Sequence, residues 1–154
     1  MKIMLDDLDR RLLRYLQLDP ATSVADLAEI ACSTPAVVSR RLTRFRNDGM
    51  VLGKEVLIDW SKLGYSVEVS LRVTLDKTQS RAFDYFLVAA RAVPQIIEIQ
   101  TFLGRVDVRL SVIAKDMSDY QMVYRDLILT LPHIADIEAL MHIMRIKSDE
   151  VLPV

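Results

Sequence analysis

Cysteine, glycine and histidine are scarce in this 154-residue sequence, and each scarcity excludes a class of protein. The single cysteine, Cys32, rules out an intramolecular disulfide and fits a reducing cytoplasm. The four glycines form no Gly-rich phosphate-binding signature. The two histidines, His133 and His142, show neither metal-ligand spacing nor a Cys/His or Ser/His pattern. The sequence therefore predicts a cytoplasmic protein without a cofactor or metal, and we do not expect an enzyme.

Long apolar runs are missing as well. No run approaches the roughly 20 residues that a membrane span needs. The opening stretch "MKIMLDDLDRR" reaches acidic residues before it forms an apolar core, so it does not read as a signal peptide. With 51% hydrophobic and 27% charged residues, the composition is that of an ordinary globular chain with no membrane partner.

Positive charge is concentrated in one short segment, although the formal net charge of the chain is only -1. Residues 33–54 hold five Lys or Arg against one acid, whereas residues 1–32 and 62–154 each hold more acids than bases. Arg40, Arg41, Arg44 and Arg46 fall within seven positions. Such a run is usually a solvated face, so its meaning depends on the structure that carries it.

Three helices are expected in the N-terminal part of the chain. Apolar residues recur at helical spacing in "LDDLDRRLLRYLQLD", where Asp6 is a suitable N-cap. Ser23 caps a second short helix, "SVADLAEIA". The third helix, "TPAVVSRRLTRFRNDG", has Thr34 as N-cap, Pro35 at its first position and Gly49 after its end. This is the order of a helix-turn-helix, whose last helix enters the DNA major groove.

The arginine cluster lies on this third helix, which makes double-stranded DNA the expected partner. The free amides at the Thr34 end of the helix suit a phosphate. Ser39, Arg40 and Thr43 are expected at base edges, and Arg44 and Arg46 at the DNA backbone. The complete predicted DNA-binding set is Thr34, Ala36, Val37, Ser39, Arg40, Thr43, Arg44 and Arg46.

Arg41 has two interpretations that the sequence leaves open. It lies close to the inward stripe of the third helix, which Val38, Leu42 and Phe45 form. At that position it either makes an ion pair with an acid of the first helix, such as Asp9, or contacts a phosphate.

The rest of the chain changes character. Residues 50–64, "MVLGKEVLIDWSKLG", are β-rich and are expected to form a wing or linker strand. Strict alternation in "SVEVSLRVTL" predicts a strand with one buried face, and helical spacing follows in "SRAFDYFLVAARA". Two strands, "IIEIQTFL" and "VDVRLSVI", precede a helix, "DMSDYQMVYRDLILTLP", and a final strand, "IADIEALMHIMRI".

This βαββαβ order predicts a ferredoxin-like sandwich with its helices on one face of the sheet. We therefore expect an α+β chain of two domains. Residues 1–61 would form a winged helix-turn-helix domain with the linker strand, and residues 62–154 the βαββαβ domain.

The last strand is apolar on both sides. One side carries Ile137, Ala139, Met141 and Ile143, and the other carries Leu140, Met144 and Ile146. The domain's own helices cover one side, and a second copy of the sheet is the best cover for the other. The pattern thus predicts a homodimer, which also suits a palindromic DNA site.

These segments together resemble the Lrp/AsnC (feast/famine) transcriptional regulators. "LDDLDRRLLRYLQLD" is similar to the opening helix of that family, and "STPAVVSRRLTRFRNDGMVLGKEVLIDWSKLG" to its recognition helix, wing and linker. "FDYFLVAARAVPQIIEIQTFLG" resembles the first helix and second strand of its effector domain. The resemblance implies a C-terminal domain of the type called regulation of amino-acid metabolism (RAM). It also implies dimers that assemble further, often to octamers, and a small effector, commonly an amino acid, bound between dimers.

The loop "LGRVDV" departs from the family pattern. By resemblance it lies at the cleft between dimers, which makes Gly104, Arg105 and Asp107 candidate effector-binding residues. Gly104 would admit a ligand close to the backbone, and Asp107 would accept hydrogen bonds from an ammonium group. Arg105, where the family commonly has an acid, favours an acidic or carboxylate-bearing effector. The alternative is that Arg105 is an exposed turn residue that pairs with Asp107 or with solvent.

Two other functions remain open on sequence. The Lrp-like sirohaem decarboxylases resemble this family in both domains and use histidines on porphyrin, although an enzyme would not need the arginine helix. A protein that bridges DNA without any effector is the other alternative. The sequence as a whole favours a cytoplasmic, homo-oligomeric DNA-binding transcriptional regulator.

Overall fold

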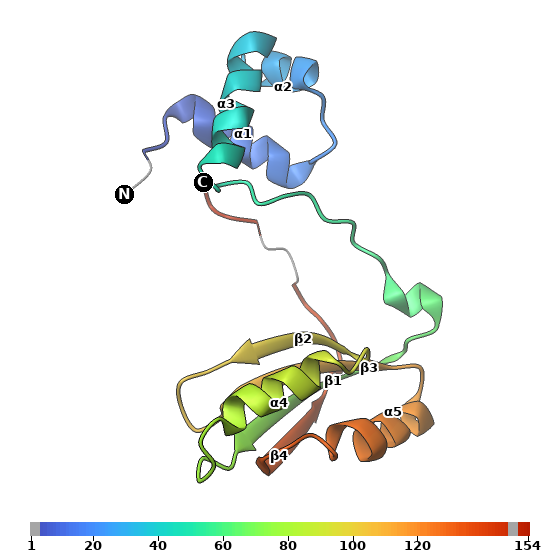
Figure 1. The fold of residues 1–154 in the computed structure, drawn as a ribbon. Coiled ribbons are helices and arrows are strands. Elements are labelled where there is room, and N and C mark those ends of the chain that lie inside the picture. The colour runs from blue at the N-terminus through green and yellow to red at the C-terminus, as the bar shows by residue number, and fades with distance from the viewer. Residues whose placement is uncertain (1–3, 148–150) are drawn as a thin grey trace. The chain divides into compact units, whose positions relative to one another are not determined.

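The computed structural model describes residues 4–147 and 151–154 (Figure 1). The chain divides into two compact units. Met1–Leu57 and Lys147–Val154 form the first unit, and Ile58–Ile146 form the second. The first unit thus includes the C-terminal segment, and the domain boundary expected after residue 61 stays a prediction. The described residues include no helix that is both long and apolar enough to cross a membrane.

The first unit contains the three expected helices. They are α1 (Asp7–Leu18), α2 (Val24–Ile30) and α3 (Pro35–Asn47). All three predicted N-caps, Asp6, Ser23 and Thr34, are confirmed because each side chain accepts a hydrogen bond from an amide in the first turn. At α1 the cap is reciprocal, since the Asp9 carboxylate accepts from the Asp6 amide in return.

One apolar cluster holds these helices together. Its buried members are Leu12, Leu27, Ala28, Ala31, Val38 and Phe45. The inward stripe expected on α3 is confirmed, with Leu42 packed partly buried against Val38 and Phe45. A short turn joins α2 to α3, and Cys32 adopts φ 52° in it. This fixes α3 against α1 and α2 with its polar side outward.

The wing or linker strand expected in residues 50–64 is wrong. Residues 51–59 have no regular secondary structure, and Trp60–Leu63 form a 3-10 helix, η1, that ends at Gly64 with φ 90°. The apolar side chains that suggested a strand are exposed, among them Leu52, Val56 and Leu57. A strand requires a hydrogen-bonded neighbour, and the described chain provides none along this segment.

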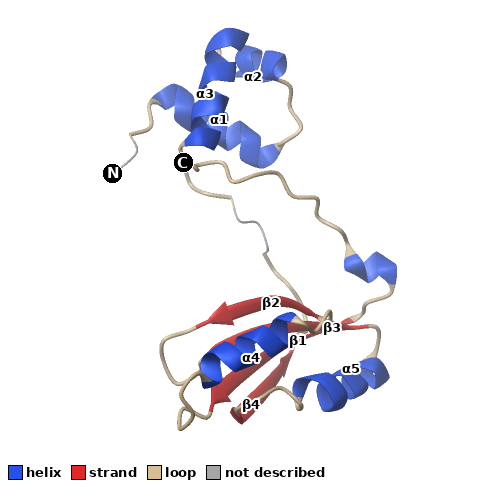
Figure 2. Cartoon of the chain, viewed as in Figure 1, coloured by secondary structure: helices blue, strands red, loops and turns tan. Residues whose placement is uncertain are grey.

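The second unit is the predicted βαββαβ sandwich (Figure 2). Its elements are β1 (Val67–Leu75), α4 (Ala82–Arg91), β2 (Ile96–Thr101), β3 (Val108–Ala114), α5 (Met117–Val123) with a π-helical extension η2 (Tyr124–Ile128), and β4 (Ile134–Met141). The strand order is β2-β3-β1-β4, and all neighbouring pairs are antiparallel. Both α4 and α5 pack on one face of the sheet (Figure 1).

The helix-covered face holds the core of this unit. Val69, Leu71 and Val73 of β1 are buried there, as their alternation predicts. Glu68, Ser70, Arg72 and Thr74 alternate with these residues and occupy the opposite face, which α4 and α5 leave open, although Glu68 and Ser70 themselves are buried.

The open face is polar rather than apolar, which corrects the expectation for the last strand. Arg72 is opposite Glu138 and 3.5 Å from its carboxylate, so Glu138 lies on the open face. Asp136 and Leu140 share that face, because residues two apart on a strand point the same way. Met144 and Ile146 lie beyond the end of β4. Of the three apolar residues expected outward, only Leu140 belongs to the strand.

Candidate nucleic-acid interface

Helix α3 presents a polar side to solvent. The Thr34 Oγ1 accepts a hydrogen bond from the Val37 amide at 3.4 Å, and Pro35 fits the next position because no amide donor is needed there. Val37 and Arg44 are half-buried. The other members of the predicted set are exposed: Thr34, Ala36, Ser39, Arg40, Thr43 and Arg46. The fold therefore brings most of that set onto the exposed side of one capped helix.

A buried carboxylate ties two of the four arginines to α1. Asp9 is only 1% exposed. Its Oδ1 lies 3.0 Å from Arg41 Nη1, and its Oδ2 lies 2.5 Å from Arg44 Nη2. Arg41 Nη1 is also 2.7 Å from Asp6 Oδ2. The ion-pair interpretation of Arg41 is thus what the structure shows, and Arg44, expected at the DNA backbone, shares the same acid.

These contacts shift the pKa values of Asp6 and Arg41. The Asp9 amide and the Arg41 guanidinium hold the pKa of Asp6 below its ordinary value. Burial alone would lower the pKa of Arg41, but the carboxylates of Asp6 and Asp9 raise it overall. Asp6 and Arg41 therefore stay charged through the physiological range, and their ion pair helps to position α3 on α1.

Arg40 and Arg46 are the two arginines of α3 that remain available. Both are exposed, and neither makes an ion pair within the described part of the chain. The Thr43 hydroxyl donates to the Ser39 carbonyl at 3.0 Å, which leaves its oxygen free to accept. The exposed side of α3 therefore offers two unpaired cations and two hydroxyl groups, the chemistry that phosphates and base edges require.

The loop between β2 and β3 separates its three candidate residues. Gly104 and Arg105 are exposed, and an added Cβ at Gly104 would meet nothing within 4 Å. The Arg105 side chain pairs with no carboxylate in the residues that the structure describes, and the Arg105 carbonyl accepts from Thr74 Oγ1 at 3.1 Å. The alternative pairing of Arg105 with Asp107 is therefore not seen.

Asp107 is buried and turned toward the end of β1. Its Oδ2 accepts from the Leu75 amide at 2.9 Å, and its Oδ1 lies 2.8 Å from the Lys77 ammonium. Burial by itself would raise the pKa of Asp107, but the hydrogen bonds and charge of Lys77 and the Leu75 amide lower it overall. Asp107 thus already accepts from an ammonium group, that of Lys77, and it holds the loop against β1.

His142 lies beside a buried carboxylate of β1. His142 Nδ1 lies 3.3 Å from the Glu68 carboxylate, which also accepts from Ser111 and Arg145 at 3.0 and 2.7 Å. In the part of the chain that can be described, no three His, Cys, Asp or Glu side chains come together to hold a metal ion. His142 therefore serves to attach the end of β4 to β1.

Two family models match the chain, and each covers one part of the fold. Residues 5–46 match the AsnC-type helix-turn-helix domain, which includes α1, α2 and almost all of α3. Residues 68–152 match the Lrp/AsnC ligand binding domain, which begins in β1 and includes the loop with Gly104 and Arg105. Together they span both units and account for most of the chain.

Individual relatives match along the whole length. The DNA-binding transcriptional activator DecR of Escherichia coli K12 is 28% identical over 151 residues, which cover 98% of this chain and 99% of the relative. An AsnC family transcriptional regulator from Agrobacterium tumefaciens has a TM-score of 0.86 and 28% identity, with 97% of each chain covered. A transcriptional regulator from Neisseria meningitidis, solved in complex with L-Met, shares the fold with a TM-score of 0.90 at 23% identity, and 97% of each chain is covered.

Proposed function

The chain belongs to the Lrp/AsnC family of DNA-binding transcriptional regulators, and from that membership we propose how its own residues engage DNA and an effector. Helix α3 lies in the major groove, with Ser39, Arg40 and Thr43 at base edges and Arg46 at a phosphate. Ala36 and Val37 line the groove near the start of the helix, where Thr34 and the free amides bind a second phosphate. A cytoplasmic location follows from this role.

One observation carries this assignment. Of the four arginines on α3, Asp9 engages Arg41 and Arg44, whereas Arg40 and Arg46 are exposed and unpaired in the described ranges. Arg41 and Arg44 thus orient α3 on α1, whereas Arg40 and Arg46 supply the cations on its exposed side. The Arg44 side chain is 37% exposed, so a contact with a DNA phosphate is a secondary role for it beside its ion pair with Asp9.

Anisotropy measurements with labelled duplexes test this directly. An operator selected from a random duplex pool is compared with a scrambled duplex. Arg40→Ala is expected to relax the preference at one operator position, at a cost of roughly 1–3 kcal/mol for the matched sequence. Arg91→Ala, which removes an arginine from the end of α4, is the control. If Arg40→Ala weakens both duplexes equally, Arg40 does not read a base.

The C-terminal domain binds a small carboxylate-bearing effector at the Gly104–Arg105 loop. Arg105 supports this because its side chain is exposed and free of carboxylate partners in the described chain, and a guanidinium matches a carboxylate with paired donors. The Neisseria relative in its L-Met complex supports an amino-acid ligand for the shared fold. Asp107 acts here as a support of the loop, because Leu75 and Lys77 already occupy its oxygens.

Calorimetric titration distinguishes the outcomes for this site. Acidic, neutral and basic amino acids are titrated into the wild type and into Arg105→Ala. A carboxylate ligand that binds the wild type and is lost in the variant, while DNA binding without ligand persists, supports the site. Equal binding to both proteins assigns the ligand elsewhere. No binding by any amino acid favours the alternative of a DNA-bridging protein without an effector.

The protein assembles as a homodimer that associates further, up to octamers. The open face of the sheet supports the dimer because Arg109 and Arg72 lie side by side on its two middle strands and Glu98 and Glu138 lie on its two edge strands. A second copy that brings its edge acids to these arginines would be held by opposite charges. Light scattering on the full chain and on residues 62–154 tests whether association resides in the second domain. A monomeric fragment beside an oligomeric full chain would assign it to the first domain.

A further inference from the structure

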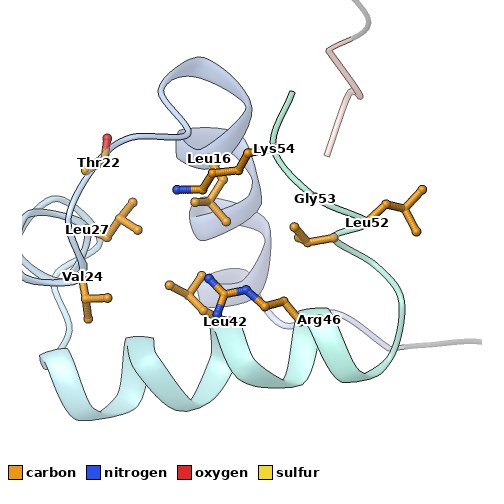
Figure 3. A pocket seen from close by; sticks show the side chains of 10 residues that line it. Leu16, Thr22, Val24, Leu27, Leu42, Arg46, Leu52, Gly53 and Lys54 are labelled. Carbon is orange, nitrogen blue, oxygen red and sulfur yellow. The ribbon is translucent and has the colours of Figure 1, made fainter. Parts of the chain in front are cut away.

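The first unit has a cavity of about 490 Å³ beside α3 (Figure 3). Its apolar wall comes from all three helices, with Leu16 of α1, Val24 and Leu27 of α2, and Leu42 of α3. The chain that follows α3 closes another side at Val51–Lys54. This volume is within the range of sites that bind small molecules.

Two cations define the polar side of the cavity. Among the described residues, Arg46 and Lys54 are the only charged ones that line it, and Figure 3 shows both side chains directed toward the space between the leucines. Neither makes an ion pair anywhere in the described residues, and no carboxylate lines the cavity. The site therefore combines a positive edge with an apolar wall.

We propose that this cavity binds a small organic acid with an apolar body, such as a short branched-chain or arylalkyl carboxylate. The carboxylate binds Arg46 and Lys54, and the body packs on Leu16, Leu27 and Leu42. An inorganic phosphate satisfies the cations but leaves the leucines uncovered. An amine or a zwitterion places an ammonium group beside two like charges.

The site has a consequence for DNA binding, and this part rests on the proposed role of Arg46 at a phosphate. A guanidinium that binds a ligand carboxylate in the cavity has fewer donors and less net charge for the DNA backbone. The acid and the duplex therefore compete. This site is distinct from the Arg105 loop, because every residue that lines it belongs to the first unit.

Calorimetry on the full chain tests the cavity with phenylacetate as the probe. Phenethylamine and phenylacetamide, which keep the ring without the negative charge, are the matched ligands. Phenylacetate is expected to bind the wild type, and each of Arg46→Ala and Lys54→Ala is expected to weaken it by about tenfold or more. Arg91→Ala, an exposed arginine at the end of α4 that lies outside both proposed ligand sites, is the control that keeps the wild-type affinity. Arg46 and Lys54 are exposed, so these substitutions leave the fold intact, which circular dichroism verifies.

The outcomes separate this site from the proposed function. No binding of phenylacetate, equal binding of phenethylamine or phenylacetamide, or unchanged affinity in Arg46→Ala and Lys54→Ala would overturn the proposal. Loss of binding in Arg105→Ala alone would assign the acid to the second unit. DNA affinity measured without acid reports on α3 independently. The last outcome is an acid that binds through Arg46 and Lys54 while DNA affinity stays unchanged. That result would contradict the proposed competition with DNA but would still support the cavity as a binding site.

Discussion

The Asp9 carboxylate and the Arg44 guanidinium lie 2.5 Å apart, and Arg41 approaches the same carboxylate at 3.0 Å. Asp9 is almost completely buried, yet the two arginines are only partly so, at 37% and 23% exposed. One acid of α1 thereby fixes two arginines of α3 in place. The cluster of positive charge in this sequence is divided between a structural pair and an exposed pair, Arg40 and Arg46.

Asp9→Ala is expected to destabilise the first unit by about 1–3 kcal/mol, because it leaves the partly buried Arg44 without its acid and leaves Arg41 with Asp6 alone. It also removes the acceptor for the Asp6 amide at the cap of α1. Asp7→Ala is the control, an exposed acid in the same helical turn that makes no ion pair within the described residues. Urea unfolding followed by circular dichroism measures the difference. Equal losses in the two variants would show that the Asp9 pairs contribute nothing.

Arg44→Ala and Arg46→Ala are expected to differ in kind. Arg46→Ala lowers DNA affinity on all sequences and reduces the slope of log affinity against log salt by about one, the effect of one phosphate contact. It leaves the free energy of unfolding within about 0.5 kcal/mol of the wild type, as is usual for an exposed residue. Arg44→Ala chiefly lowers that free energy. Salt titrations of DNA affinity and urea unfolding measure the two effects on both variants. A larger loss of stability in Arg46→Ala and a larger loss of DNA affinity in Arg44→Ala would reverse the two roles.

The sequence predicts the local elements of this fold well. Helix starts depend on one side chain and the amides of the next turn, so Asp6, Ser23 and Thr34 are readable from the sequence. The strand expected in residues 50–64 fails because its formation depends on a neighbouring strand that a local pattern does not specify. Leu52, Val56 and Leu57 carry the composition of a strand without such a partner.

The contacts of the candidate site are harder to predict from the sequence, because long side chains reach partners that their position on an element does not indicate. Helical spacing places Arg44 outward, but its flexible stem brings the guanidinium back to Asp9. Asp107 presents a similar case, since its place in a loop gives no indication that the Leu75 amide and Lys77 occupy it. Lys54 was not assigned by sequence reasoning, because only the fold brings it beside Arg46 and the leucines of three helices.

Gln17→Ala is expected to loosen the C-terminal segment from α1. The Leu152 amide donates to Gln17 Oε1 at 2.5 Å, and Gln17 Nε2 donates to the Leu152 carbonyl at 3.4 Å. The variant leaves the Leu152 amide without its acceptor, while the Leu152 carbonyl still accepts from the Val154 amide at 2.9 Å. This loss lowers the stability of the first unit by about 0.5–1.5 kcal/mol. Hydrogen exchange is expected to accelerate in α1 and at Leu152 and to remain unchanged in the sheet. Gln121→Ala, on the exposed side of α5, is the control, and unchanged exchange in α1 would contradict the attachment.

Asp107→Asn is expected to lower the stability of the second unit by about 1–3 kcal/mol at neutral pH, because Lys77 loses its charged partner. The pKa of Asp107 is lowered in the folded state, so its contribution to stability is fully present above the ordinary carboxyl pKa. As the pH falls through that value toward the lower folded pKa, the contribution is lost. The wild type therefore loses its advantage over the variant as the pH falls below the ordinary carboxyl pKa of about 3.9.

Urea unfolding of both proteins at a series of pH values measures this convergence. Asp136→Asn is the control, since Asp136 is exposed on β4 and makes no ion pair in the described part of the chain. Its unfolding curve is expected to keep the wild-type pH dependence. If the free energy of unfolding of Asp107→Asn follows the same pH dependence as that of the wild type down to acid pH, the contact with Lys77 does not stabilise the charged form of the Asp107 carboxylate. In that case other contacts hold the loop that carries Gly104 and Arg105, such as the Asp107 amide on the Val73 carbonyl at 3.0 Å and the Thr74 hydroxyl on the Arg105 carbonyl at 3.1 Å.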